Sequence, residues 1–181
     1  MNKKIGAAGA LVDLLAVLGF AVCMLLDFDS GSYFCSMFIA FGFVIMMCDF
    51  LYFAAPERRT AGYAAAAFSA VYAAIILVVY FTQLTTVRLA GLTEKARELL
   101  DFQQMGLFFS LDLLGYALMS LATFFAGLTV EPKDKPSKWL RALLMIHGVF
   151  FISCLIMPML GVFQHGSAWQ CWSSGAPISA L

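Results

Sequence analysis

Charged side chains are scarce in this sequence. Only 12% of its 181 residues are Asp, Glu, Lys or Arg, whereas a soluble domain carries about 25%. The 11 basic and 11 acidic residues give a formal net charge of zero, so no basic surface indicates nucleic acid as a partner. Hydrophobic residues make up 62% of the chain, and the mean hydropathy is +0.90. A core of this size cannot bury that much apolar surface, so the composition predicts an integral membrane protein whose principal partner is the lipid bilayer.

The sequence also lacks the motifs of the common catalytic and cofactor sites. It has five cysteines but no Cys-x-x-Cys pair, and no spacing of His and Cys typical of zinc. It contains no glycine-rich phosphate loop, no His-Glu-x-x-His and no nucleophile elbow. We therefore predict no metal and no cofactor. A protein that is not an enzyme is favoured, although the sequence does not decide this.

Five long apolar runs are separated by short polar segments. Each run exceeds the roughly 20 residues that a helix needs to cross the hydrocarbon core of a bilayer. The apolar residues are continuous rather than alternating, which excludes the strands of a membrane barrel. We predict an all-α membrane helical bundle, a single domain over residues 1–181, with transmembrane helices at 5–26, 34–55, 61–87, 105–130 and 139–163. Pro158 predicts a kink in the fifth helix.

Two segments fall outside these helices. Residues 89–104 mix apolar and charged side chains at helical spacing, and Thr93 precedes a charged turn as an N-cap. We expect a short amphipathic helix there, lying on the outer surface as a lid or as a connector. The tail, 164–181, is rich in Ser and Gly and is expected to be irregular and extracytoplasmic.

The basic residues predict the orientation. With the N-terminus in the cytoplasm, eight Lys and Arg side chains fall on the cytoplasmic side and three on the outer side. The positive-inside rule therefore favours an N-in/C-out topology. The first run has the basic start of a signal peptide, but it is longer than a typical apolar region of that kind and Asp13 interrupts it. We expect it to be retained as a helix.

Three ionisable residues, Asp13, Asp49 and His147, lie inside the first, second and fifth predicted helices. The helical rise of 1.5 Å per residue places all three at a similar depth in the cytoplasmic half. Ionised side chains in hydrocarbon cost about 2.5–3.5 kcal/mol on insertion scales, so they normally face protein or water. One interpretation is hydrogen bonding between helices. The other is a proton or cation site, because a histidine beside carboxylates titrates near neutral pH.

A second polar group, consisting of Gln83, Arg88, Asp112 and Tyr116, lies toward the outer side. Gln83 and Arg88 are near the end of the third predicted helix, and Asp112 is near the start of the fourth. Asp112 and Arg88 form either a structural ion pair or a pair that orients a ligand in an outward-facing pocket. These four residues are the candidate ligand-binding site.

Small residues recur every four positions on the third helix, at Gly62, Ala66, Ala70 and Ala74. This pattern is typical of close helix packing, either within the bundle or in a homodimer. Cys35 and Cys171 both fall on the predicted outer side. A disulfide between them would hold the tail on the outer rim if that compartment is oxidising.

Two segments, Tyr80–Arg88 and Asp112–Ser120, read YFTQLTTVR and DLLGYALMS. With this pair of segments the chain resembles uncharacterised bacterial multi-pass membrane proteins. The resemblance covers less than a third of the chain, in the third and fourth helices. It implies a small protein of the bacterial inner membrane and no activity, because such families have no assigned function.

Three functions are compatible with these features. The first, which we favour, is binding or helping transport a small or lipidic ligand. The second is a structural subunit that interacts with partners through the small-residue stripe. The third is a membrane-embedded enzyme acting on a lipid or isoprenoid, with Asp112 or the layer of Asp13 and His147 as acid–base groups.

Overall fold

The computed structural model describes residues 2–160, and this part of the chain is helical without any strand. The elements in chain order are α1 (Asn2–Leu25), α2 (Asp29–Phe53), η1 (Pro56–Arg58), α3 (Arg59–Leu84), η2 (Thr86–Arg88), α4 (Glu94–Leu100), η3 (Phe102–Gln104), α5 (Leu107–Thr129), α6 (Lys135–His147) and α7 (Phe150–Met159). Five segments are long and apolar enough to cross a membrane: α1, α2, α3, α5, and α6 together with α7. The predicted five-helix membrane bundle is confirmed.

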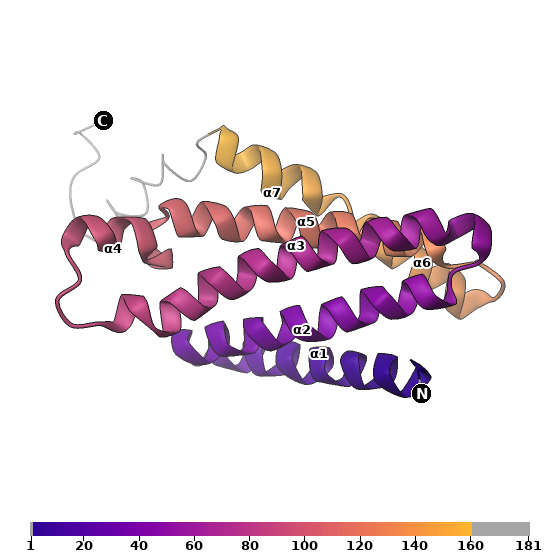
Figure 1. Ribbon diagram of the computed structural model, residues 1–181, viewed down its shortest axis with the longest axis horizontal. Helices are drawn as coiled ribbons and strands as arrows, with labels where there is room; N and C mark the ends of the chain where they lie inside the picture. The colour runs from indigo at the N-terminus through magenta and orange to yellow at the C-terminus, as the bar shows by residue number, and fades with distance from the viewer. Residues whose placement is uncertain (1, 161–181) are drawn as a thin grey trace.

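Successive long helices run in opposite directions along the bundle, and each packs mainly on its neighbour in sequence (Figure 1). α2, α3 and α5 form the middle of the bundle. α1 packs on α2 at one edge, and α6 and α7 pack on α5 at the other. We call the two ends of the bundle the α4 end and the η1 end. The N-terminus and the α5–α6 connection lie at the η1 end (Figure 1).

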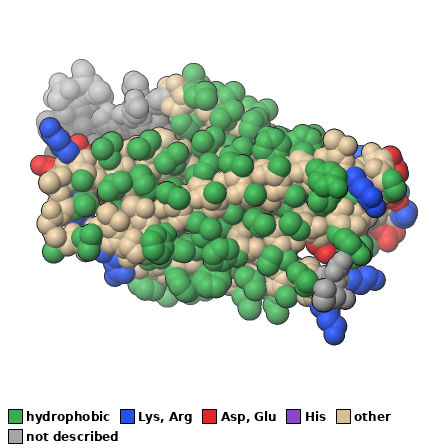
Figure 2. Space-filling model, viewed as in Figure 1, with side chains coloured by type: hydrophobic (Ala, Val, Ile, Leu, Met, Phe, Trp, Pro, Cys, Tyr) green, Lys and Arg blue, Asp and Glu red, His purple; other side chains and the backbone are tan. Residues whose placement is uncertain are grey.

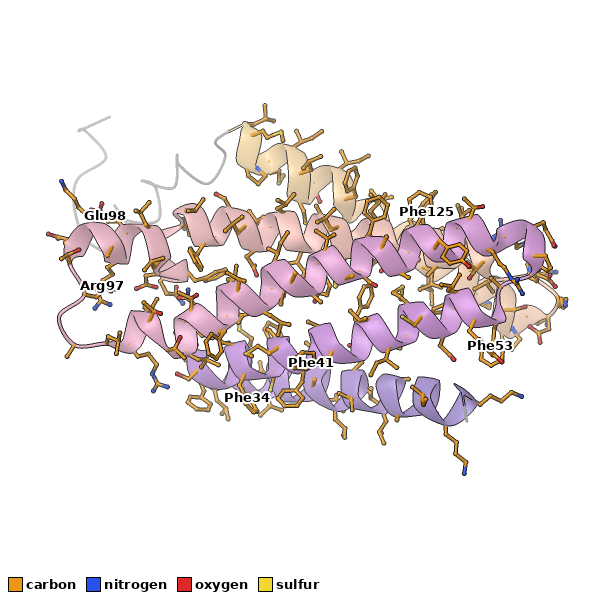
Figure 3. The ribbon with its side chains drawn as sticks, viewed as in Figure 1. Phe34, Phe41, Phe53, Arg97, Glu98 and Phe125 are labelled. Carbon is orange, nitrogen blue, oxygen red and sulfur yellow. The ribbon has the colours of Figure 1, made fainter. Side chains whose placement is uncertain are left out.

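The surface divides into an apolar body and charged ends. Figure 2 shows hydrophobic side chains over the length of the bundle, with Lys, Arg, Asp and Glu gathered at its two ends. Arg97 and Glu98 mark the α4 end, and Phe53 lies near the η1 end (Figure 3). An apolar surface of this extent would be unfavourable in water and is the normal surface of a protein in lipid.

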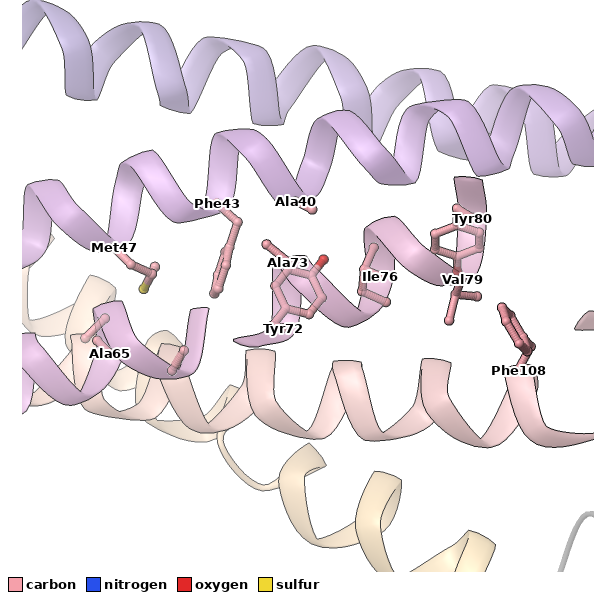
Figure 4. Packing of buried hydrophobic residues seen from close by; sticks show 12 residues of the cluster. Ala40, Phe43, Met47, Ala65, Tyr72, Ala73, Ile76, Val79, Tyr80 and Phe108 are labelled. Carbon is pink, nitrogen blue, oxygen red and sulfur yellow. The ribbon is translucent and has the colours of Figure 1, made fainter. Parts of the chain in front are cut away.

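The core lies between α2, α3 and α5. Phe43 and Met47 of α2 meet Tyr72 and Ile76 of α3, and Phe108 closes the same cluster from α5 (Figure 4). The ring of Phe43 contacts that of Tyr72 edge-on, with a centroid distance of 5.4 Å. Because these helices are buried on the face they share, they set the positions of the polar side chains between them.

Glycines bring α1 and α2 into close contact. A Cβ atom on Gly42 would lie 2.8 Å from the backbone nitrogen of Asp13, and one on Gly9 would lie 2.5 Å from Ile45. Lipid tails are as apolar as leucine, so helices in a membrane associate through close packing of this kind. The close approach of α1 and α2 therefore depends on these small residues.

The fifth span differs from the prediction for residues 139–163. It begins earlier, at Lys135, where Asp134 and Ser137 form a capping box. It is interrupted at Gly148 and not at Pro158, which lies inside α7. The break packs closely on α5 and requires glycine, because a Cβ atom on Gly148 would lie 2.8 Å from Cβ of Phe124. Residues 161–163 and the tail, 164–181, lie outside the described residues, as does Cys171.

The other boundaries are close to those predicted, and the amphipathic segment is confirmed in part. Residues 89–104 contain α4 and η3, and the hydroxyl of Thr93 accepts a hydrogen bond from the backbone N–H of Ala96 at 3.3 Å. Cys35 is a free thiol within the described residues, and its bond to Cys171 stays a prediction.

The N-in/C-out orientation is testable by labelling. In a variant without native cysteines, we expect Lys95→Cys at the α4 end to react with a membrane-impermeant maleimide on intact cells. Glu57→Cys at the η1 end should react only after the membrane is permeabilised. The reverse pattern would reject the predicted orientation, and equal labelling of both sites would indicate two populations of topology.

Candidate functional site

Asp112 is the most deeply buried carboxyl group of the bundle. It lies five residues into α5 and is 4% exposed. The hydroxyl of Tyr80 on α3 hydrogen-bonds to its carboxyl group, whereas the Oδ1 atom has no hydrogen-bond partner among the described residues. Asp112 is thus held inside the protein rather than facing lipid.

Tyrosines extend this polar region across three helices. The hydroxyls of Tyr80 and Tyr116 lie 3.4 Å apart, and the Tyr116 hydroxyl also interacts with Ser36 on α2. The ring of Tyr33, also on α2, stacks on that of Tyr80 with a centroid distance of 5.4 Å. We call Asp112, Tyr33, Tyr80, Tyr116 and Ser36 the tyrosine cluster.

Gln83 closes the tyrosine cluster toward the α4 end. Its Nε2 donates to the carbonyl of Leu100 at 2.7 Å, and its Oε1 accepts from the N–H of Phe102 at 3.0 Å. The ring of Phe102 then lies against Tyr33 and Tyr80, with centroid distances of 6.1 and 6.3 Å. Both ends of the Gln83 amide bond to backbone, so this side chain holds the segment from Leu100 to Phe102 over the cluster. We call this segment the roof.

Arg88 lies apart from the other three residues of the predicted ligand site. It is exposed on η2, and no ion pair joins it to Asp112 in the part of the chain that the structure describes. α3 ends at Leu84, three residues before the predicted end at 87, and the following turn carries Arg88 away from the bundle. Gln83, Asp112 and Tyr116 are brought together, and Arg88 is not.

The structure does not bring Asp13, Asp49 and His147 together. Asp13 lies beside Gly42 between α1 and α2, and Asp49 lies farther toward the η1 end, beside Gly6. His147 is on α6, which packs on α5 at the opposite edge, and its ring lies 5.5 Å from that of Phe150. Within residues 2–160, no group of three His, Cys, Asp or Glu side chains is close enough to hold a metal ion.

A cavity of about 530 Å³ opens at the η1 end, between α1, α2 and the segment after α5. Its apolar wall consists of Gly6, Ala10, Met46, Phe50, Phe53, Ala55 and Val130, and its polar wall of Asp49, Thr129, Glu131 and Lys133. Two adjoining hollows of about 290 and 500 Å³ also have Gly6 and Asp49 in their walls. Asp49 is therefore the carboxyl group common to the whole recess.

Gly6 has no side chain, and the carboxyl group of Asp49 occupies the space beside it. A Cβ atom on Gly6 would meet the carboxyl group of Asp49, with Oδ1 at 2.6 Å. No ion pair of Asp49 is present among the described residues, in which the two salt bridges are Arg97–Asp101 and Lys133–Glu131. The carboxyl group is thus available to a ligand in the cavity.

Arg58 and an ion pair hold the segment after α5 that lines the mouth of the cavity. The Nη1 atom of Arg58 donates to the carbonyls of Leu128 and Val130, at 3.3 and 3.0 Å, and so satisfies groups left free at the end of α5. Glu131 pairs with Lys133, and this hydrogen bond and charge lower the pKa of Glu131 and raise that of Lys133. The rim therefore presents charges of both signs at neutral pH.

Sequence reasoning missed this cavity. Of its lining residues, only Asp49 was a candidate, and it was grouped with Asp13 and His147. A usable signal was present in Glu131 and Lys133, which flank the end of an apolar run, but their nearness to Asp49 depends on how α1, α2 and α5 pack.

No protein-family model, curated protein or solved structure matches this chain. The resemblance of Tyr80–Arg88 and Asp112–Ser120 to bacterial membrane proteins stays an expectation. The tyrosine cluster and the Asp49 cavity are the two candidate sites of the bundle.

Replacing Gln83 tests the role assigned to the roof. Gln83→Leu keeps the volume but leaves the Leu100 carbonyl and the Phe102 N–H without partners. Each unsatisfied buried group costs about 1–3 kcal/mol, so we expect a clear fall in the thermal unfolding midpoint of the protein in detergent. Gln103→Leu is the matched control, because Gln103 is exposed and its bonds to Asp29 and Tyr33 are long, at 3.4 and 3.3 Å. Equal midpoints for the two variants would show that Gln83 does not hold the roof.

Proposed function

We propose that this protein binds an amphiphilic, lipid-like ligand in the Asp49 cavity, as a binding protein or as part of a transport process. The observation that carries the proposal is a recess of about 530 Å³ that combines an aromatic wall with an unpaired carboxylate. Cavities that hold small molecules measure about 300–1,000 Å³ and are mostly apolar with a few placed polar groups. The Asp49 cavity fits that description.

The two walls suit the two parts of an amphiphile. Phe50, Phe53 and Met46 offer apolar surface to a hydrocarbon chain. Asp49 offers an anionic acceptor, which favours a headgroup with an ammonium group. Lys3 lines the adjoining hollow and Lys133 the rim, where cationic side chains suit a phosphate. An aminophospholipid carries all three chemical features.

The depth of the cavity agrees with a headgroup site. Asp49 lies four residues before the end of α2, or about 6 Å from it. With the predicted N-in orientation, this level is the inner leaflet of the membrane. The resemblance to bacterial proteins supports the bacterial cytoplasmic membrane as the location.

The ligand site that the sequence predicts, at Gln83, Arg88, Asp112 and Tyr116, has less support. The amide of Gln83 is bonded to backbone at both ends, and Arg88 lies outside the cluster. Tyr80 and Tyr116 contact each other, so a ligand would have to displace protein contacts to enter.

A second candidate is a subunit that associates through α3. Gly62 is buried against Leu51, but Ala70 and Ala74 of the same stripe are exposed. The intramolecular contacts therefore use only part of the stripe. The exposed part leaves a homodimer as an alternative, in which bulky substitutions at Ala70 would lower the oligomeric state.

Native mass spectrometry of the gently solubilised protein tests the ligand proposal. We expect the wild type to retain a lipid of discrete mass, and Asp49→Asn to lose most of it because the anionic acceptor is gone. Ala10→Leu should lose it as well, because the larger side chain fills the cavity from α1.

Two matched controls separate binding from folding. Asp27→Asn changes an exposed aspartate at the α4 end, and Ala8→Leu adds the same bulk on α1 outside the cavity wall. Both should keep the bound lipid. A wild-type protein without any retained lipid, or equal retention in Asp49→Asn and Asp27→Asn, would contradict the proposal.

A further inference from the structure

Two cysteines face each other across the α1–α2 hairpin. Cys23 lies two residues before the end of α1, and Cys35 lies six residues after the start of α2. Both are free thiols and both are half-buried. The connection between the helices is short, and the backbone N–H of Phe28 donates to the carbonyl of Cys23 at 2.9 Å. This bond fixes the position of Cys23 relative to the beginning of α2.

Residues at equal distances from Asp27 lie opposite each other in this hairpin. Cys23 and Gly31 are each four residues from Asp27, and Gly19 and Cys35 are each eight residues from it. The contacts agree with this register. A Cβ atom on Gly31 would lie 2.6 Å from Sγ of Cys23, and one on Gly19 would lie 2.9 Å from Sγ of Cys35. Each sulfur thus lies over a glycine of the other helix.

The direction of helical side chains brings the two sulfurs toward each other. A side chain on an α-helix leans toward the N-terminus of its own helix. Because α1 and α2 run in opposite directions, Cys23 leans toward the level of Cys35, and Cys35 leans toward the level of Cys23. The side chain of Cys35 also hydrogen-bonds to that of Cys23. Since Gly19 and Gly31 have no side chains, the helices approach closely enough for this contact.

The remaining cysteines lie elsewhere or outside the described residues. Cys48 is about 20 Å from Cys35 along α2, and Cys154 is on α7. Cys171, the partner that the sequence predicts for Cys35, lies outside the described residues. One sulfur forms one disulfide, so a bond from Cys35 to Cys23 and a bond from Cys35 to Cys171 exclude each other.

We propose that Cys23 and Cys35 are a redox modification site, at which a disulfide joins α1 to α2 when a disulfide-bearing oxidant reaches the α4 end. The thiolate of one cysteine attacks a sulfur of the oxidant and releases the oxidant's first thiolate. The thiolate of the other cysteine attacks the mixed disulfide, forms the Cys23–Cys35 bond and releases the second thiolate. The pair loses two protons and two electrons, and the oxidant gains them as two thiols.

The two cysteines differ in their access to an oxidant. From the helical rise, Cys23 lies about 3 Å from the end of α1 and Cys35 about 9 Å from the start of α2. Cys23 is therefore the sulfur that attacks the oxidant, and Cys35 resolves the mixed disulfide. With the predicted N-in orientation, the α4 end lies outside the cytoplasm, where disulfides form and persist. The Asp49 cavity lies at the other end of α1, so the proposal does not rest on a bound ligand.

Disulfide mapping tests the modification site. The purified full-length protein is reduced in detergent, freed of reductant and incubated with oxidised glutathione. Remaining thiols are alkylated, and peptides of the non-reduced protein are identified by mass spectrometry. We expect a pair of peptides joined through Cys23 and Cys35, from a protein that migrates at monomer size on a non-reducing gel. The thermal unfolding midpoint should be higher than that of the reduced protein, because the bond restricts the unfolded chain.

Serine variants identify the sulfurs that take part. Cys23→Ser and Cys35→Ser should each lose the joined peptides and the rise in midpoint. Cys48→Ser is the matched control on α2, and Cys171→Ser removes the competing partner; both should form the bond as the wild type does. Elution of each variant as a single species of wild-type size establishes that it is folded. Free thiols or an unresolved glutathione adduct at Cys23 and Cys35 after oxidation, or a Cys35–Cys171 bond in the wild type, would overturn the proposal.

Discussion

The structure depends on one property of its solvent, which is that hydrocarbon offers no hydrogen bonds. Every polar group within the spans must therefore find its partner in the protein. Serine and threonine hydroxyls donate to carbonyls of their own helices, as in Ser36 to Ser32 and Thr123 to Met119. Arg58 donates to carbonyls that α5 leaves free, and the Gln83 amide donates to the Leu100 carbonyl and accepts from the Phe102 N–H. Against this background, buried atoms without partners are informative: within the described residues, they occur on Asp13, Asp112 and His147.

The same solvent determines how the helices associate. Apolar side chains gain little by leaving lipid for protein, so close packing and internal polar contacts decide which helices meet. Glycines allow α1 to approach α2, and aromatic rings together with the tyrosine cluster join α2, α3 and α5. Because each span packs mainly on its neighbours in sequence, α1 and α6 end at opposite edges. That arrangement separates Asp13 from His147 at whatever depth the two residues lie.

The sequence was sufficient for the features that depend on one helix at a time. Length and hydropathy predicted the five spans, and Thr93 predicted the start of α4. Depth along a helix brought Gln83, Asp112 and Tyr116 together correctly, because they lie on the neighbouring helices α3 and α5. The prediction that Asp13, Asp49 and His147 lie together was wrong. Depth along a helix does not give the direction in which a side chain points around the helix axis, or which helix is adjacent. The sequence predicts the irregularity of the fifth span at Pro158 and misses the break at Gly148, where the chain packs closely on Phe124 of α5.

The two polar regions differ in how completely the protein satisfies them, and that difference decides which of them can admit a ligand. At the α4 end, the Gln83 amide bonds to backbone at both ends and the Tyr80 and Tyr116 hydroxyls contact each other, so a ligand would have to displace protein contacts. At the η1 end, Asp49 faces an open recess with charged groups at its rim, where a headgroup has space. α1 carries Asp13, which lies beside Gly42 of α2, and also Gly6 and Ala10, which line the cavity. Because α1 packs mainly on α2, with close approaches at Gly9 and Gly42, a ligand in the cavity would contact a helix that is joined to the bundle mainly through one neighbour.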